Sequence, residues 1–390
     1  MLVPRNVRLL SWFNFLLDFR PYAPIAILYF SQVSGSYALG MSIFSAATVA
    51  QSLFEVPTGI FSDLIGRKKT IVCGAAASVF SLLFYAIGSL YVALLIGAIF
   101  EGLARAFYSG NNDAFLHDTL AETGQRDSYQ EWKGKTTAMF QVGLAISAVI
   151  GSLLAAISFQ AVMWVSVIPM MLALLVSLRF SEPRTHTPQD LNPYAHLRQS
   201  FKNTVQNPRL LKLSAASILG WAIGESAWLF RSAFIVTLWP VWAIGFAQML
   251  ANAGAAAGFY FAGRIIKRFG EYRLLVGGMT FSEVVNLFCV LVPTVFSPAL
   301  MSLNSVFFGV NSTAISGLMQ HEFTDEQRAT MGSLNSFAGA LVFAAFSFFM
   351  GGLADQFGVI PALLCSTLLF FVPVSLYRWT LRPSTASTPA

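Results

Sequence analysis

Five carboxylates stand inside long apolar stretches of this 390-residue chain, and three arginines stand among them. The carboxylates are Asp18, Glu55, Glu101, Glu225 and Glu283, and the arginines are Arg20, Arg105 and Arg231. An ionised side chain in hydrocarbon costs about 3 kcal/mol or more, so such residues indicate a site that binds a proton, neutralises another charge or meets a charged ligand. Asp18, Glu101 and Glu225 fall near the centres of their stretches and are the first candidates.

Glu101 and Arg105 are four residues apart, in the order that favours an ion pair within one helix. Such a pair is either a self-neutralising structural feature or part of a binding site, and the sequence leaves both open. A paired Glu101 stays charged, whereas a carboxylate without a cationic partner in apolar surroundings can bind a proton near neutral pH. The predicted proton carrier is therefore Asp18 or Glu225, which lie 207 positions apart.

Helical periodicity separates the two charges nearest the N-terminus. On one helix Asn14, Asp18 and Tyr22 share a face, whereas Arg20 lies roughly 160° around the axis from Asp18. The spacing predicts that Asp18 and Arg20 do not pair, and that Arg20 meets a neighbouring helix or an anionic group of a ligand. Pro21, with a second proline soon after it, is expected to kink the helix just beyond this point.

Composition identifies the medium in which these helices lie. Hydrophobic residues make up 56% of the chain and charged residues 11%, with a mean hydropathy of +0.64, which no ordinary soluble protein shows. Apolar runs of about twenty residues recur from end to end, and each is long enough to cross ~30 Å of hydrocarbon. Barrel strands would show alternating segments of ~10 residues instead. The predicted fold class is therefore an all-α membrane protein.

Polar breaks divide the apolar runs into twelve predicted transmembrane helices. Their approximate ranges are 7–30, 37–61, 70–88, 90–112, 136–157, 160–180, 210–232, 239–262, 274–292, 297–319, 329–353 and 359–379. The longest polar stretch, 181–209, separates two predicted six-helix bundles, 1–180 and 210–380, and a disordered tail is expected over 381–390. Within the polar stretch, apolar residues at helical spacing predict a short amphipathic helix on the inner membrane face.

Basic residues predict the orientation of the chain. Of the 24 Lys and Arg residues, all but Arg20, Arg105 and Arg231 fall in the N-terminus, in loops after even-numbered helices or at the C-terminal end. By the positive-inside rule, both termini of this multi-pass protein are expected on the cytoplasmic side of the inner (plasma) membrane. The net charge of +6 reflects that topology and attraction to anionic membrane lipid, so no nucleic-acid partner is expected.

An internal repeat relates the two predicted halves. Four residues of the fourth helix, Phe100, Gly102, Ser109 and Gly110, recur 207 positions later in the tenth helix as Phe307, Gly309, Ser316 and Gly317. Similar halves that run in the same direction predict two pseudo-symmetric six-helix bundles.

A stripe of small residues marks the fifth predicted helix. Gly143, Ser147 and Gly151 recur every four residues, a spacing that lets another helix approach closely. We expect this stripe at the interface between the two halves.

The stretch GIFSDLIGRKK, residues 59 to 69, lies between the second and third predicted helices. It resembles the signature loop of the major facilitator superfamily, G-x-x-x-D-x-x-G-R-[KR]-[KR], through Gly59, Asp63, Gly66, Arg67, Lys68 and Lys69. With twelve predicted helices and a central polar loop, the resemblance covers the whole chain, but it is not specific for a substrate. It implies the fold of that superfamily, in which helices 1, 4, 7 and 10 line a central cavity.

The resemblance also implies a conformational latch at this loop. Asp63 can pair with Arg67 and lie near the positive N-terminus of another helix. In the family a further acidic residue at the end of helix 4 joins this network, and Asp118 is the best match here, with Asp113 second. The predicted latch residues are Gly59, Asp63, Gly66, Arg67, Lys68 and Asp118. Breaking a two-state latch shifts conformational populations rather than removing a site.

Several classes of protein are excluded by missing motifs. The near-match to a phosphate-binding loop at Gly134-Lys135-Thr136 lacks the required earlier glycine, because Tyr129 stands there. The sequence has no G-x-S-x-G or H-E-x-x-H motif, and its four histidines all fall in polar segments. The three cysteines all lie in predicted helices and suggest no metal cluster. We therefore expect no enzyme, catalytic residue, cofactor or metal.

The remaining class is a secondary active transporter that moves a small organic solute by alternating access. We expect it to be coupled to protons, to work as a monomer and to contact membrane lipid. The predicted pathway residues are Asp18, Glu101, Arg105, Glu225, Arg20, Asn14 and Tyr22. A lipid or amphiphile flippase or exporter on the same fold, or an uncoupled facilitator, are the open alternatives, since a fold does not determine a function.

Overall fold

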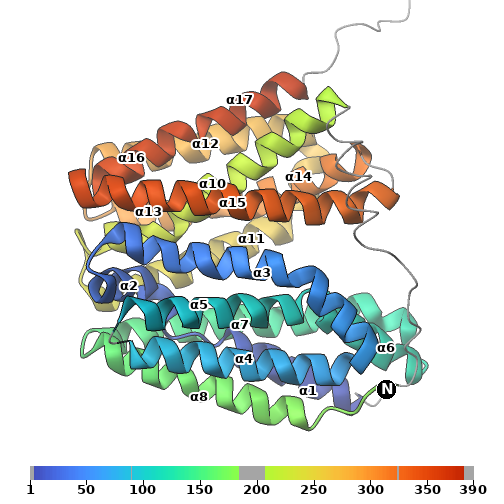
Figure 1. Cartoon of the computed structure of the whole chain (residues 1–390). Coiled ribbons are helices and arrows are strands. Elements are labelled where there is room, and N and C mark those ends of the chain that lie inside the picture. The colour runs from blue at the N-terminus through green and yellow to red at the C-terminus, as the bar shows by residue number, and fades with distance from the viewer. Residues whose placement is uncertain (1–3, 89, 184–206, 323–324, 382–390) are drawn as a thin grey trace, which may run out of the picture. The chain divides into compact units, whose positions relative to one another are not determined.

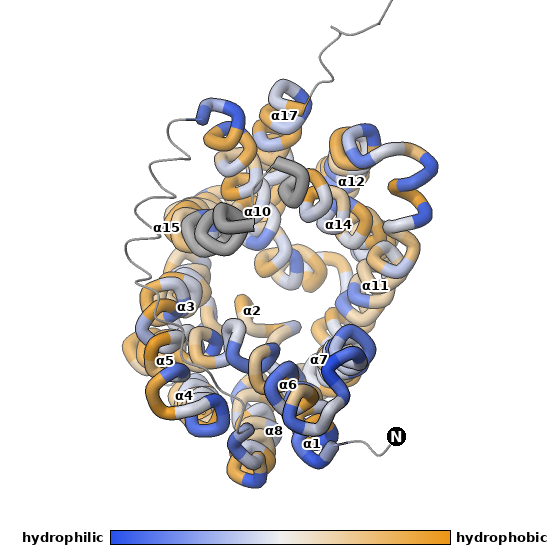
Figure 2. The backbone as a smooth tube through the Cα atoms, turned by 90° about the vertical axis from the view of Figure 1, so that its right-hand side faces the viewer, coloured by the Kyte–Doolittle hydropathy of each residue, from blue (hydrophilic) through white to orange (hydrophobic). Residues whose placement is uncertain are grey.

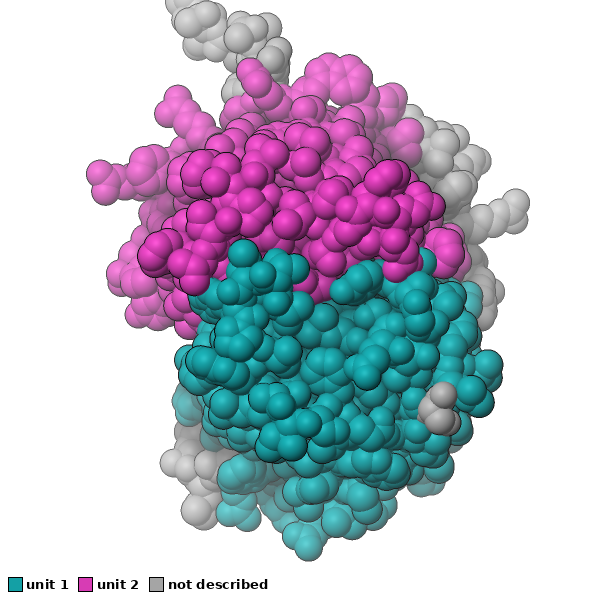
Figure 3. All heavy atoms as spheres, turned by 90° about the vertical axis from the view of Figure 1, so that its left-hand side faces the viewer, with its two compact units in different colours: residues 1–191, 235–249 teal, residues 192–234, 250–390 magenta. Residues whose placement is uncertain are grey.

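The computed structural model describes residues 4–88, 90–183, 207–322 and 325–381, with the side chains of these residues outside 319–334. Every regular element in these ranges is a helix. The contacts divide the chain into two compact units, residues 1–191 with 235–249 and residues 192–234 with 250–390 (Figure 3). The predicted amphipathic helix lies outside the described residues, as do residues 382–390 of the predicted tail.

The first unit is a helical bundle. Its helices are α1 (Arg5–Asp18), α2 (Ala26–Ser34), α3 (Tyr37–Ile65), α4 (Arg67–Ile87), α5 (Tyr91–Tyr108), α6 (Asn111–Glu122), α7 (Tyr129–Ala155) and α8 (Phe159–Leu178), with short 3-10 turns η1 (Ala23–Ile25), η2 (Arg126–Ser128) and η3 (Val241–Ala243). In Figure 1, α3 lies against α5, α5 against α4 and α4 against α8, while α1 packs on α7 and α8. Figure 2 shows hydrophilic residues concentrated on α6 and the adjacent end of α7.

The second unit is also built from helices alone in its described residues. They are α10 (Pro208–Ile235), α11 (Ile244–Phe269), α12 (Glu271–Leu291), α13 (Ser297–Leu303), α14 (Val306–Glu322), α15 (Asp325–Phe357), α16 (Val359–Leu369) and α17 (Phe371–Thr380). Helix α12 packs against α13, α14, α16 and α17, and α15 packs against α16. The first turns of α11, through Met249, belong to the first unit by their contacts. There the Ser152 hydroxyl of α7 donates to the Trp242 carbonyl at 2.9 Å.

Each of the twelve predicted helices coincides with a helix, or with a broken helix, of the structure. By length and hydropathy alone, nine helical segments of the described residues qualify as membrane spans. The first, eighth and tenth predicted helices do not qualify. The first is interrupted after Asp18 and the tenth after Leu303, whereas the eighth, α11, is long enough but not apolar enough. The predicted all-α membrane fold is confirmed. Its main difference from the prediction is that some helices predicted to be continuous are broken.

Helix α1 ends at Asp18 because of the proline that follows. Pro21 has no N–H to donate, and it disfavours the helical conformation at Arg20 before it. Phe19 leaves the helical region with a ψ of 81°, and the Arg20 amide donates to the Asp18 carbonyl at 3.0 Å. Residues 19–25, which we call the α1–α2 connector, therefore separate α1 from α2.

The α1–α2 connector lies directly against α7. A Cβ atom at Gly151 would stand 1.8 Å from the Pro21 carbonyl oxygen, and one at Gly143 would stand 2.6 Å from the Phe15 carbonyl oxygen. These two glycines therefore face α1 and the connector within the first unit. Their expected place at the interface between the halves is wrong, because the backbone of the broken helix needs the same close approach.

Replacing Gly151 by alanine is expected to destabilise the first unit by about 1–3 kcal/mol, because the added methyl collides with the Pro21 carbonyl. Gly134→Ala on the same helix is the matched control, since nothing lies within 4 Å of a Cβ there and alanine favours the helix. Thermal unfolding of the detergent-solubilised protein should show a lower midpoint for G151A and an unchanged or higher one for G134A. Equal midpoints for the two variants would contradict this packing.

Candidate functional site

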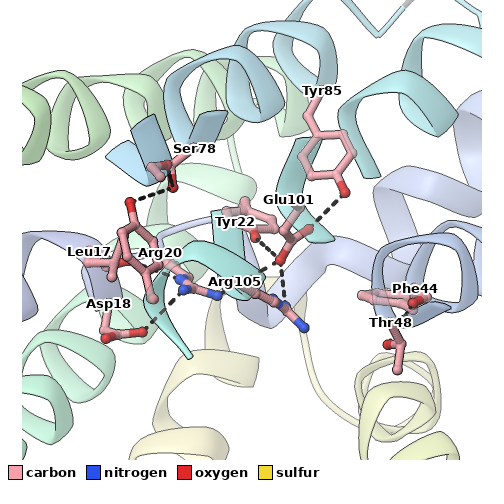
Figure 4. A network of polar contacts seen from close by, with 12 residues as sticks. Leu17, Asp18, Arg20, Tyr22, Phe44, Thr48, Ser78, Tyr85, Glu101 and Arg105 are labelled. Atoms are coloured by element: carbon pink, nitrogen blue, oxygen red, sulfur yellow. Dashed lines mark hydrogen bonds and ion pairs between the residues drawn. The ribbon is translucent and has the colours of Figure 1, made fainter. Parts of the chain in front are cut away.

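Glu101, only 9% exposed on α5, is held by four side chains (Figure 4). Its Oε1 accepts hydrogen bonds from Arg105 Nη2 at 2.5 Å and from the Tyr22 hydroxyl at 3.2 Å. Its Oε2 accepts from the Tyr85 hydroxyl at 2.8 Å, and Arg20 Nη1 lies 3.8 Å from Oε1. The predicted pairing of Glu101 with Arg105 is confirmed. Two guanidinium groups and two hydroxyls thus stabilise one buried carboxylate.

Asp18, 8% exposed at the end of α1, joins the same network through Arg20. Arg20 Nη2 lies 3.3 Å from Asp18 Oδ1, and Arg20 Nε donates to the Leu17 carbonyl at 2.9 Å. Among the described residues, Arg20 is the one cation within 4 Å of Asp18. Arg20 therefore bridges Asp18 and Glu101, and Figure 4 shows its guanidinium between the two carboxylates.

The expected separation of Asp18 and Arg20 is wrong. An angle of roughly 160° applies to one continuous helix, but α1 ends at Asp18 and Arg20 belongs to the α1–α2 connector. The guanidinium folds back onto the helix end, where unpaired carbonyls and the negative end of the helix dipole favour a cation. The expectation that Arg20 meets a neighbouring helix is confirmed by its contact with Glu101 on α5.

The same break removes the helix face predicted for Asn14, Asp18 and Tyr22. Tyr22 still reaches the network, because its hydroxyl donates to Glu101 and its amide donates to Ser166 Oγ on α8 at 3.1 Å. In the described part of the chain, no hydrogen bond or ion pair connects Asn14 to the network. Glu225 lies half-buried on α10 in the second unit, and its role stays a prediction.

A small cavity adjoins the network. Its volume is about 20 Å³, which holds a water molecule but not an organic ligand. The lining residues are Arg20, Tyr22, Ser78, Ser81, Leu82, Glu101, Ala104, Arg105, Tyr108 and Met170. The Tyr108 and Ser78 hydroxyls lie 3.2 Å apart on its wall. In this arrangement the two arginines serve the protein's own carboxylates.

The signature loop forms the ion pairs that its resemblance implies. Arg67 Nη1 lies 3.5 Å from Asp63 Oδ1, and Arg67 Nε lies 3.7 Å from Asp118 Oδ2. Arg67, at the start of α4, thereby joins α4 to α3 and α6. Gly66 has a φ of 99°, a conformation that favours glycine. Gly59 lines a hollow of about 360 Å³ beside Asp63 and Arg67. The contacts are confirmed, and their role as a latch stays a prediction.

Sequence reasoning missed a buried polar ring behind these ion pairs. Arg67 Nη1 donates to Ser62 Oγ at 3.0 Å, Ser62 Oγ donates to Asn111 Oδ1 at 2.7 Å, and Asn111 Nδ2 donates to the Arg67 carbonyl at 3.1 Å. Ser62 is 2% and Asn111 4% exposed, so each hydrogen bond replaces one that water no longer supplies. The glycine before Asn111 was the available signal, because it marks the break at which α6 begins.

Sequence reasoning also missed Glu182, which follows α8. Its Oε1 accepts from the Arg67 amide at 2.6 Å and its Oε2 accepts from the Lys68 amide at 2.9 Å. These N–H groups belong to the first turn of α4, where a carboxylate is favoured by the helix dipole. A Cβ at Gly66 would stand 2.7 Å from Glu182 Oε1, so the signature glycine also makes room for this carboxylate.

These features define a multi-pass helical membrane protein with charged residues inside its apolar helices. The sequence profile of the Major Facilitator Superfamily matches residues 9–345, and the chain belongs to that family. Members of the family are transporters rather than enzymes, which confirms the predicted superfamily and the prediction of a transporter.

Relatives in sequence are distant. An uncharacterized MFS-type transporter of Methanocaldococcus jannaschii is 30% identical over 134 residues, 34% of this chain and 33% of that protein. A Na(+), Li(+), K(+)/H(+) antiporter of Planococcus maritimus is 28% identical over 196 residues, 46% of this chain and 42% of the antiporter. The chain thus spans less than half the length of these two relatives. The uncharacterized MFS-type transporter YceJ of Bacillus subtilis is 22% identical over 371 residues, 91% of this chain and 90% of YceJ.

Solved structures share the fold over nearly the whole chain. The nucleoside transporter NupG has a TM-score of 0.83 at 13% identity, covering 97% of this chain and 99% of its own. The E. coli fucose:proton symporter FucP has a TM-score of 0.60 at 15% identity, covering 96% of this chain and 98% of its own. At these identities the likeness shows the fold alone.

Removing Arg105 is expected to cost about 2–4 kcal/mol, because Arg105→Met leaves the buried Glu101 carboxylate with the more distant Arg20. The lower part of that range applies, since the Arg105 side chain is 37% exposed. The double variant E101Q/R105M is the matched control, because it removes both charges together. Thermal unfolding should place the double variant above R105M, and a double variant less stable than R105M would contradict the pairing.

Truncating Glu182 is expected to destabilise the start of α4 by about 1 kcal/mol, as loss of a helix cap does. Asp127→Ala, an exposed carboxylate on η2, controls for the charge change. Gly66→Ala should be worse than Glu182→Ala, because it strains the backbone and displaces the carboxylate. In thermal unfolding, adding E182A to G66A should cost little further; full additivity would show that the two residues act independently.

Proposed function

We propose that this chain moves a small organic solute across the cytoplasmic membrane by alternating access, and that the movement is coupled to protons. One observation carries the proposal: at membrane depth a single guanidinium, that of Arg20, is shared between Asp18 at 3.3 Å and Glu101 at 3.8 Å. A shared cation makes the charge of each carboxylate depend on the other. That dependence is what coupling of a proton to a solute requires.

Asp18 is the proton-binding member of this network. Glu101 receives hydrogen bonds from Arg105, Tyr22 and Tyr85, and these all favour its ionised form. Asp18 is equally buried, but among the described residues its one cation within 4 Å is Arg20, which it shares with Glu101. Of the two carboxylates, Asp18 therefore gives up fewer stabilising interactions of its ionised form when it takes up a proton.

Protonation of Asp18 changes what the network attracts. With both carboxylates ionised, the two negative charges balance the two guanidinium groups of Arg20 and Arg105. When Asp18 is neutral, one positive charge remains in excess, and an anionic group of a solute can neutralise it. A proton and an anionic solute then favour each other's binding, which is positive coupling. The solute class that fits best is a small organic compound carrying such a group.

The Arg67 ion pairs with Asp63 and Asp118 act as the conformational latch of this cycle. Their formation in one state and loss in the other shifts the balance between conformations without touching the solute. The distribution of Lys and Arg supports a cytoplasmic location of both termini. The internal repeat supplies both halves within one chain, so a monomer is sufficient.

The names of two proteins similar to this chain support proton coupling. The relative from Planococcus maritimus is a Na(+), Li(+), K(+)/H(+) antiporter, and the structural neighbour FucP is a fucose:proton symporter. Both therefore move protons, each with its own partner.

Neutralising Asp18 or Glu225 is expected to abolish gradient-driven transport while leaving solute binding at least partly intact. Proteoliposomes with and without a pH gradient would be screened with organic anions, cations and sugars to find a transported solute. Asp18→Asn and Glu225→Gln should then reduce uptake to the level seen without a gradient, because a neutral side chain cannot exchange a proton. Binding to the solubilised variants would be measured by calorimetry.

Asp127→Asn is the matched control, since it removes an exposed carboxylate outside the network and should leave the gradient response unchanged. Uptake that keeps its full pH dependence in both D18N and E225Q would overturn proton coupling through these residues. Movement of lipid or amphiphile in the same vesicles, without uptake of any soluble compound, would instead favour a flippase.

A further inference from the structure

A second polar cluster lies in the second unit, and the proposed function uses none of its residues. It comprises Ser282, Glu283 and Asn286 on α12 and Asn304 just after α13, and we call it the α12–α13 cluster. Asn304 Nδ2 donates to the Ser282 carbonyl at 2.9 Å, to Ser282 Oγ at 3.0 Å and to Asn286 Oδ1 at 3.1 Å. Asn286 Nδ2 donates to Glu283 Oε1 at 3.3 Å.

The cluster determines which group faces Glu283. Because the amide oxygen of Asn286 already accepts a hydrogen bond from Asn304, its amide nitrogen must point toward the carboxyl group. An amide donor can bond to the carbonyl oxygen of a protonated acid as well as to a carboxylate. The hydrogen bond from Asn286 therefore positions Glu283 in both protonation states and does not strongly favour either one.

Glu283 has no cation within 4 Å among the residues that the structure describes. The nearby Arg231 on α10 is engaged elsewhere, since its Nη1 donates to the Met301 carbonyl at 3.3 Å and its guanidinium lies 5.0 Å from the Trp228 ring. Met301 is one helical turn from Asn304, so Arg231 reaches the same segment without pairing with Glu283.

The helices packed against α12 offer few other titratable groups. Helix α13, and α14 as far as Leu318, carry no Asp, Glu, Lys, Arg, His, Cys or Tyr. Helix α16 carries Cys365, and α17 carries Tyr377 and Arg378 near its end. Helix α12 itself carries Cys289 and, in its first turn about three turns before Glu283, Glu271, Tyr272 and Arg273. The charge that bears on Glu283 from the described residues around it is therefore that of Arg231.

The fold surrounds the carboxyl groups of Glu283 and Glu101 with different partners. Glu101 has two guanidinium groups and two hydroxyls, whereas Glu283, half-buried in a span, has one neutral amide donor. An ionised carboxylate so placed is unfavourable, because apolar surroundings do not solvate its charge, and a proton removes that cost. We propose that Glu283 is a proton-binding site of the second unit, and that loss of its proton draws Arg231 from the Met301 carbonyl to the carboxylate.

The test is carboxyl modification of the purified full-length protein with dicyclohexylcarbodiimide, which reacts with protonated carboxyls in apolar surroundings. Labelling would be mapped by peptide mass spectrometry from about pH 5 to about pH 9, a range spanning the shifted values of buried carboxyls. We expect Glu283 to be labelled in reactions at low pH and progressively less in reactions at higher pH, while Glu101 in the same samples stays unlabelled. In Arg231→Met the labelling should persist to higher pH, because the nearest cation is gone.

A second measurement does not depend on access of the reagent. The infrared C=O band of a protonated carboxyl, identified by its loss in Glu283→Gln, should disappear when the pH is raised. A pH-independent band, or no band and no label at any pH, would overturn the proposal. Asp18 keeps its own contact with Arg20 in E283Q, so failure here leaves the proposed role of Asp18 unaffected.

Discussion

The structure of the first unit depends on how a buried negative charge is neutralised. Glu101 sits on an apolar helix, and an unbalanced carboxylate there would cost several times the thermal energy. Its partners come from three places: Arg105 on the same helix, Tyr85 on α4, and Arg20 and Tyr22 on the α1–α2 connector. The connector can supply two of them only because α1 stops at Asp18.

The break in α1 in turn shapes its neighbours. The freed backbone approaches α7 so closely that Gly151 cannot carry a side chain without meeting the Pro21 carbonyl, and Ser166 on α8 accepts the Tyr22 amide. A proline, a glycine and a serine on three elements thus position Arg20 between two carboxylates. The function we propose rests on that position, because a shared cation responds to the loss of either negative charge.

The features that depend on local spacing follow from the sequence. Apolar runs predict the helices, the i,i+4 spacing predicts the Glu101–Arg105 pair, and the signature loop predicts the contacts of Arg67. The Asp18–Arg20 pair was missed, although Arg20 precedes a proline and so leaves the helix. Tyr85 and Glu182 could not be predicted, because they lie 16 and 115 residues from the groups that they bind and no local pattern marks them.

The central claim is that a proton and a solute move through one coupled site. Its most direct test is the proton itself: proteoliposomes containing the purified protein and a pH-sensitive dye receive a transported solute with no imposed pH gradient. The account predicts a change of internal pH that begins with solute entry and scales with the amount transported. Solute uptake with no accompanying proton movement would contradict it.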